Sequence, residues 1–136
     1  MVIEAEKYDV TVGIEGVHYF VINSPEMMKR LIDDVASENI KVIFDPCNLL
    51  NEENYLKQDE IINSMFDLLG DKIVAVHVKD FTVENGHFVD GIAPGKGMLN
   101  YELILKRLSP DVPIIGEGFD EFDTVRAYEY FEGLLS

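Results

Sequence analysis

Basic residues are scarce in this sequence. Eleven lysine and arginine residues stand against 26 aspartate and glutamate residues, and the formal net charge at pH 7 is −15. So large an acidic excess repels a phosphate backbone unless a local basic groove or a metal ion outweighs it. Nucleic acid is therefore not an expected partner.

Cysteine and long apolar runs are also nearly absent. The single cysteine, Cys47, has no partner for an internal disulfide, which favours a reducing cytoplasm. Residues 1–10 contain neither the basic segment nor the apolar stretch of a signal peptide. No apolar run reaches the length of a membrane span, so we expect no membrane association.

The chain is short for the pattern that it contains. Its 136 residues, 47% of them apolar, suffice for one globular domain with a real core, which we place at residues 1–136. A complete barrel of eight strands and eight helices usually takes ~250 residues. The sequence can therefore hold only part of such a barrel.

Four short apolar runs rich in β-branched residues predict strands. Nearly continuous apolar residues, without alternation, are typical of strands covered on both faces, as in a parallel sheet. The four runs are Asp9–Glu15 (DVTVGIE), Lys41–Asp45 (KVIFD), Ile73–Asp80 (IVAVHVKD) and Pro113–Gly118 (PIIGEG).

Segments with helical spacing separate these strands. Ser24 and Pro25 mark the start of one helix, whose apolar residues continue to Val35. We expect further helices before Asp9 and over residues 55–69, 100–108 and 120–134. Alternating strands and helices predict right-handed crossovers and a parallel sheet. Half of a barrel and a small doubly wound sheet both fit this order.

Each apolar run ends with a residue that can bind a metal ion. These residues are Glu15, Asp45, His77 and Glu117, which follow one another at intervals of 30, 32 and 40 residues. In barrels the C-terminal ends of the strands form the active site, so one ligand per strand would converge on one ion. Three carboxylates and one imidazole favour manganese, magnesium or cobalt, and zinc is also compatible.

An alternative interpretation of these residues is structural. Acidic residues often follow strands because they cap the next helix or lie in solvated loops. That explanation suffices for any one of the four. It is a poor explanation for four such residues, each at the end of an apolar run.

Five motifs carry a resemblance to a known family. GIEGVHYF, FDPCNLL, VHVKD, PGKG and GEGF resemble, in order and spacing, the last four strand-helix units of sugar phosphate isomerases and epimerases with a xylose isomerase-like TIM barrel. The motifs extend over nearly the whole chain. The resemblance implies an α/β fold that is the C-terminal half of the barrel, strands 5 to 8.

The resemblance also implies a cofactor and a reaction. The positions of Glu15, Asp45, His77 and Glu117 would bind one divalent cation, for which we expect a preference for Mn²⁺. Glu15 and Glu117 would be the catalytic residues, lying on opposite sides of a carbohydrate and moving a proton through an enediolate. A cation that polarises the substrate oxygens and a carboxylate that takes the α-proton are what this chemistry requires.

Other residues near the strand ends are candidate substrate ligands. His18 and Asn48 each follow a metal-ligand position by three residues. Lys79 could add positive charge at the rim, and Asp80 could orient His77 or bind substrate. Lys96 and the backbone of Pro94–Gly97 could bind a phosphate. The structural alternative is loop solvation for Lys79 and Asp80, and a tight turn for Pro94–Gly97. We expect Cys47 to be a small core residue and His87 to lie in a hairpin turn.

Three other functions remain for comparison. Apurinic-site endonucleases share the fold but carry an additional Asp-x-His pair, and Val89 and Gly91 stand at those positions here. A dehydratase acting on a polyol or keto sugar would use the same cation and the same proton abstraction.

A half-barrel could also be non-catalytic. Because its two sheet edges are open, we expect self-association or pairing with an N-terminal half.

Overall fold

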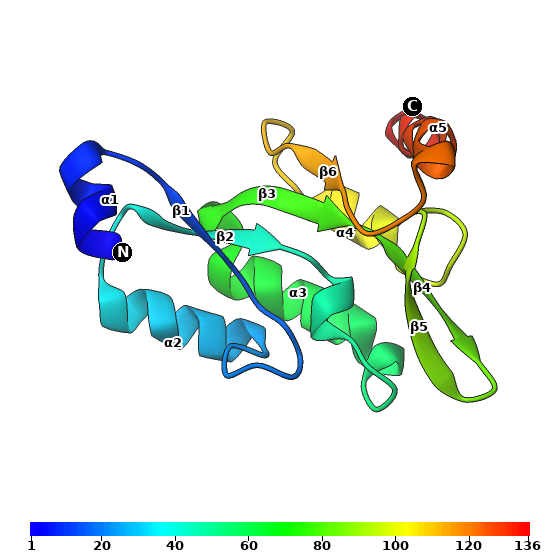
Figure 1. The fold of residues 1–136 in the computed structure, drawn as a ribbon, viewed down its shortest axis with the longest axis horizontal. Helices are drawn as coiled ribbons and strands as arrows, with labels where there is room; N and C mark the ends of the chain where they lie inside the picture. Colours follow the sequence, from blue (N-terminus) through cyan, green and yellow to red (C-terminus); the bar gives the residue numbers. More distant parts are fainter.

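Four parallel strands form the central sheet in the order β1-β2-β3-β6 in the computed structural model, which describes residues 1–136 (Figure 1). One or more helices separate each strand from the next along the chain, as the sequence predicts. The strands are β1 (Val12–Glu15), β2 (Ile40–Phe44), β3 (Ile73–Val78) and β6 (Ile114–Gly116).

Three helices cover the same face of this sheet (Figure 1). Two of them begin at side-chain caps, because Ser24 accepts a hydrogen bond from the Met27 N–H and Asn100 accepts one from the Leu103 N–H. The covering helices are α2 (Pro25–Val35), α3 (Gln58–Leu69) and α4 (Tyr101–Arg107), while α1 (Val2–Tyr8) and α5 (Thr124–Leu135) lie toward the two ends of the molecule.

The hydrophobic core lies between the sheet and these three helices. Val42, Phe44 and Val76 point into it and are 0% exposed. Their sequence neighbours in the strands point to the opposite face, because side chains alternate along a strand. Full burial of each such side chain stabilises the fold by about 1.5–3 kcal/mol before entropy is considered. Helices on one face only are the arrangement of a barrel wall, whereas a doubly wound sheet has helices on both faces.

A β-hairpin interrupts the strand-helix order after β3. The strand ends at Val78, two residues earlier than the sequence pattern indicates, and β4 (Asp80–Glu84) pairs antiparallel with β5 (His87–Ile92). Asn85 and Gly86 both have positive φ at the turn between them, as a tight two-residue hairpin requires. His87 is thus the first residue of β5, next to the turn in which it was expected.

The opposite face of the sheet has no helix over it, and both edge strands, β1 and β6, have one unpaired edge. Backbone register places Glu15 beside Ile43 and His77 beside Ile115 on this face. We call it the inner face, because it would face the axis of a closed barrel. No helix of the chain combines the length and the apolar composition that a membrane span requires.

Candidate metal centre

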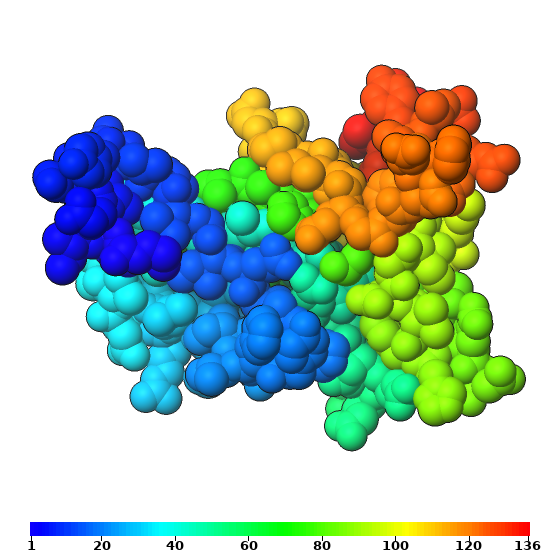
Figure 2. Space-filling view, in the orientation of Figure 1, coloured from blue at the N-terminus to red at the C-terminus, as the bar shows by residue number.

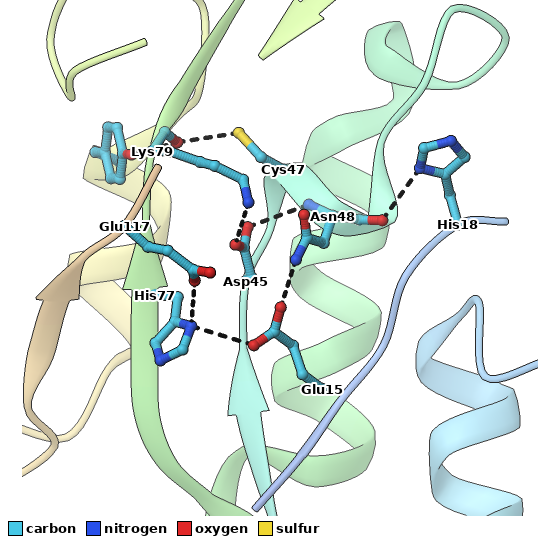
Figure 3. Close-up of polar contacts among 9 residues, drawn as sticks. Glu15, His18, Asp45, Cys47, Asn48, His77, Lys79 and Glu117 are labelled. Atoms are coloured by element: carbon cyan, nitrogen blue, oxygen red, sulfur yellow. Dashed lines mark hydrogen bonds and ion pairs between the residues drawn. The ribbon is translucent and has the colours of Figure 1, made fainter. Parts of the chain in front are cut away.

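Four potential metal ligands lie together at the C-terminal end of the sheet. Glu15 is the last residue of β1, Asp45 follows β2 directly, His77 lies in β3, and Glu117 follows β6 directly. One donor atom from each lies within 4.8 Å of the donor atoms of the other three. The structure therefore brings together the four residues that the sequence singles out (Figure 3).

Strand register explains why these four side chains share one face. Glu15 pairs with Ile43 and His77 pairs with Ile115 across the parallel sheet. Asp45 and Glu117 lie two residues beyond those partners, and residues two apart in a strand point to the same side. The alternation of the strands thus directs all four toward the inner face.

Direct contacts join the four residues. Nδ1 of His77 lies 3.1 Å from Oε2 of Glu15 and 2.5 Å from Oε2 of Glu117 (Figure 3). Asp45 has a different partner, since its Oδ2 lies 2.9 Å from the Lys79 ammonium. One imidazole and one ammonium therefore face three carboxylates, which leaves negative charge in excess.

Burial and mutual repulsion change the acidity of two of the carboxylates. Burial raises the pKa of Glu15, and the negative charge of Asp45 raises it further. Burial also raises the pKa of Asp45, against the opposing effect of the Lys79 ammonium. Both groups bind protons more readily than in water, as expected where carboxylates are held close together without enough positive charge.

The donor set fits a divalent cation. Two buried atoms, Oδ2 of Asp45 and Nδ1 of His77, make no hydrogen bond and have only the ion-pair contacts with Lys79, Glu15 and Glu117, although buried polar atoms are normally hydrogen-bonded. Ligands on opposite sides of an ion with bonds of about 2.1–2.4 Å lie roughly 4–5 Å apart, which is compatible with the 4.8 Å limit here. Oxygen-rich ligands with one imidazole suit magnesium, manganese, cobalt or zinc.

Asn48 supports the cluster from the side of β2. Its backbone N–H donates to Oδ1 of Asp45 at 3.1 Å, and its side-chain amide donates to Oε1 of Glu15. One residue thereby orients two of the four potential ligands. The Asn48 amide thus makes a hydrogen bond within the site, whereas the sequence pattern suggests only that it faces a substrate.

His18 lies one step farther from the cluster. Its backbone N–H donates to the Asn48 carbonyl oxygen at 2.7 Å, and its Nδ1 lies 3.3 Å from the same oxygen. The imidazole points away from the four potential ligands (Figure 3). His18 therefore fixes the Asn48 backbone and presents its ring to the outer part of the site.

Lys79 lies inside the site and not at its rim, because only 8% of it is exposed. Although burial alone would lower its pKa, the close contact with the Asp45 carboxylate raises it, so Lys79 is an ammonium. Its carbonyl oxygen accepts hydrogen bonds from Sγ of Cys47 at 3.0 Å and from the Tyr101 hydroxyl at 2.8 Å. These two contacts hold the backbone from which the ammonium reaches Asp45.

Cys47 and Tyr101 are core residues with one polar contact each. Burial raises the pKa of both side chains, so Cys47 remains a thiol and has no nucleophilic role. No sequence motif points to Tyr101, which lies 22 residues after the backbone that it supports. Only the tertiary structure reveals this support.

Asp80 has a different role from the one expected. Its carboxylate accepts backbone hydrogen bonds of 2.9–3.0 Å from the loop between β5 and α4 and from its own neighbour, and it makes none with His77. The donors are the N–H groups of Phe81, Gly95, Gly97 and Leu99. A Cβ on Gly97 would lie 2.3 Å from the Phe81 carbonyl oxygen, so the loop requires glycine there.

The candidate phosphate-binding groups at Pro94–Gly97 are engaged within the chain. The N–H groups of Gly95 and Gly97 are bound by Asp80, and the Lys96 ammonium lies 2.6 Å from Asp123. The donors that a phosphate would need are therefore occupied by carboxylates of the chain itself. The structure supports the alternative interpretation of this stretch as a tight turn before α4.

Comparisons with known proteins agree with this architecture. A family model described as xylose isomerase-like TIM barrel matches residues 2–124, while no curated protein matches the sequence. Among solved structures, a D-tagatose 3-epimerase-like protein is similar to the chain with a TM-score of 0.73 and 22% identity, covering 98% of this chain and 50% of that one.

Two further structures extend the comparison. The probable 3-DHS dehydratase AsbF from Bacillus anthracis has a TM-score of 0.71 and 15% identity, over 96% of this chain and 51% of that chain. A xylose isomerase-like TIM barrel protein from Mycobacterium smegmatis, in complex with magnesium, has a TM-score of 0.70 and 17% identity, over 96% of this chain and 44% of that chain.

These likenesses show that the four strands form half of a barrel. The chain spans about half the length of the proteins to which it is similar, and its sheet is one wall of their barrel. With the family model matched over residues 2–124, the chain belongs to the xylose isomerase-like TIM barrel family.

Proposed function

We propose that this chain carries the metal site of a divalent-cation-dependent isomerase or epimerase that acts on a small carbohydrate. The observation that carries this proposal is the convergence of Glu15, Asp45, His77 and Glu117 from four successive strands within 4.8 Å. Similarity to a D-tagatose 3-epimerase-like protein supports the same chemistry. We expect Mn²⁺ to be preferred, since three of the four ligands are hard oxygen donors.

Glu15 and Glu117 are the proposed proton carriers. A bound divalent cation would polarise the carbonyl and neighbouring hydroxyl oxygens of the substrate. One glutamate removes the proton α to the carbonyl to give an enediolate, and the other, protonated beforehand, donates its own proton to the neighbouring carbon or to the opposite face. The raised pKa of Glu15 brings this carboxylate closer to the pH at which a general base works best. Asp45 and His77 act as ligands only.

Three of the expected substrate ligands remain in this proposal. They are Asn48, which contacts Glu15, Lys79, which contacts Asp45, and His18, which contacts the Asn48 backbone. Asp80 and Lys96 are left out because their contacts are with the loop before α4 and with Asp123, and not with the cluster.

Metal binding tests the centre independently of turnover. We expect calorimetric titration with MnCl2 to give one site per chain, and the combined variant Asp45→Asn, Glu117→Gln to bind at least about 100-fold more weakly. The variant Glu52→Gln, Glu53→Gln removes two charges from a nearby loop and is the matched control. Equal binding by the cluster variant and the native chain would refute the ligand assignment.

A dehydratase is the second candidate reaction. It is favoured by the similarity to a probable 3-DHS dehydratase, and it begins with the same α-proton removal. Incubation of Mn²⁺-loaded protein with ketoses in D2O would show deuterium incorporation in either case. Loss of water from the product identifies the dehydratase, and its retention identifies the isomerase or epimerase.

We further propose that residues 1–136 act as half of a barrel in the cytoplasm, where a lone cysteine suits the reducing conditions. The open edges of β1 and β6 would be closed by an N-terminal half or by a second copy. We expect the chain to form dimers at micromolar concentration, and a strictly monomeric mass by light scattering would contradict self-association. Failure of deuterium exchange with intact Mn²⁺ binding would identify a non-catalytic half.

A further inference from the structure

An open cavity lies beyond the metal cluster, at the C-terminal ends of the strands. Its volume is about 640 Å³, and three segments that each follow a strand line it. They are the loop after β1, the loop after β2, and the hairpin strand β5 (Figure 2, blue, teal and yellow-green). The side chains that matter are His18, Tyr19, Glu52, Glu53, Phe88 and Asp90.

Two contacts connect this cavity with the candidate metal centre. His18, which lines the cavity, binds the carbonyl oxygen of Asn48, and the Asn48 amide donates to Glu15. A ligand that reaches the metal cluster from this side therefore passes His18. The cavity is placed to hold the part of a substrate that does not react.

Aromatic side chains form one wall of the cavity. Tyr19 is 69% exposed and packs edge-on against His18, with ring centroids 4.9 Å apart. Phe88 contributes from the hairpin, where it stacks on the buried Phe81. Exposed aromatic rings held by their neighbours provide apolar faces for the C–H groups of a ligand without ordering cost.

Carboxylates are the only charged groups in the rest of the lining. Glu52, Glu53 and Asp90 can accept hydrogen bonds from hydroxyl groups, and no lysine or arginine lines the cavity. Glu52 is held in place, because its Oε1 lies 3.0 Å from Nδ1 of His87 and accepts a bond of 3.4 Å from the Phe88 N–H. A phosphate monoester would meet repulsion here.

A second location for a phosphate is also occupied. Barrels often bind phosphate with the loops after the last two strands, and one of these, the loop before α4, contains Pro94–Gly97. There the N–H groups of Gly95 and Gly97 already bind Asp80, and Lys96 binds Asp123. Neither the cavity nor this loop offers a free donor set for a phosphate.

We propose that this cavity is a subsite for an uncharged carbohydrate, and that the substrate is a free sugar or polyol and not a sugar phosphate. This inference rests on the proposed function and narrows its substrate class. Hydroxyl groups donate to Glu52 and Asp90, while the C–H face of the sugar packs on Tyr19 and Phe88.

Titration with paired ligands tests the subsite. The 15N-labelled chain, loaded with Mg²⁺ as a diamagnetic ion, is titrated with D-fructose and with D-fructose 6-phosphate, and separately with D-xylulose and D-xylulose 5-phosphate. We expect the free sugars to shift amide signals of residues 18–20, 51–53 and 88–90. Dissociation constants for the phosphates should be at least roughly tenfold higher.

Two variants and a control locate the binding. Tyr19→Ala and Asp90→Ala should each weaken binding of the free sugars about fivefold or more. Tyr128→Ala removes a similarly exposed aromatic on α5, outside this cavity, and should leave the affinity unchanged. Asp90→Lys should reverse the preference by strengthening binding of the phosphates.

Outcomes of this experiment separate the two proposals. Tighter binding of the phosphates, or no shift at the cavity with any of the four ligands, overturns the subsite. The Mn²⁺ titration described above is independent of both results. Intact metal binding without cavity shifts refutes the subsite alone, and cavity shifts without metal binding refute the metal-dependent function alone.

Discussion

The two faces of the sheet differ in what they contribute. On the helix-covered face Val42, Phe44 and Val76 are 0% exposed and make the dry core. On the inner face Ile115 is 45% exposed, and the charged cluster occupies the strand ends. Successive residues of one strand point to opposite faces of the sheet. One face therefore holds the core that stabilises the fold, and the other holds the potential metal ligands.

The helices show the same contrast between centre and edge. α3 buries Ile62, Met65, Phe66 and Leu69 against the sheet, whereas α5 buries only Ala127. An open apolar cavity of about 330 Å³ lies between α5 and β6. The centre of the half-barrel is packed like a complete domain, whereas its edge at α5 is loosely packed.

The largest expected effect contrasts the two faces directly. Phe44→Ala should lower the free energy of unfolding by about 3–5 kcal/mol, because it leaves a cavity beside Phe66, whose ring contacts Phe44 edge-on. Ile115→Ala, on the inner face, should cost less than about 1 kcal/mol. Urea unfolding followed by circular dichroism measures both, and similar losses would contradict the separation of the faces.

A second contrast concerns the loop between β5 and α4. Asp80→Asn should destabilise the protein by about 2–4 kcal/mol, since the buried carboxylate accepts four backbone N–H groups. Lys96→Gln, in the same loop, removes only a partly exposed ion pair and should change stability by less than about 1 kcal/mol. Equal effects in the same unfolding assay would show that Asp80 does not organise the loop.

Metal binding should stabilise the inner face. Free Mn²⁺ at 100 times its dissociation constant should raise the free energy of unfolding by about 2.7 kcal/mol. Asp45→Asn should abolish that increment, whereas Phe44→Ala should retain it at a lower baseline. Thermal unfolding with and without MnCl2 provides the measurement, and an increment of the same size in Asp45→Asn would exclude this site as its source.

The smallest expected effect is the pH dependence of the metal-free protein. The folded-state pKa values of Glu15 and Asp45 lie above their ordinary values of 4.5 and 3.8. The folded chain therefore holds more protons at these two groups than the unfolded chain does. The stability that Glu15 and Asp45 contribute consequently falls as the pH rises from their ordinary pKa values through the raised ones. Compared with native protein, Glu15→Gln should show a shallower decline in urea midpoint.

The sequence predicts the parallel order of strands and helices well because its signals are local. Apolar runs, the Ser24 cap and the ligand at each strand end depend on residues near one another in the chain. Strand alternation then determines that Glu15, Asp45, His77 and Glu117 share a face. The half-length of the barrel follows from the count of strand-helix units.

Tertiary structure alone decided which polar groups are free to act. The sequence offers Lys79, Asp80 and Lys96 as candidate substrate ligands, yet Lys79 reaches Asp45, Asp80 binds the loop backbone, and Lys96 pairs with Asp123. These partners are separated along the chain by between 15 and 34 residues. A buried polar group must find a partner, and only the packed fold determines which partner is within reach.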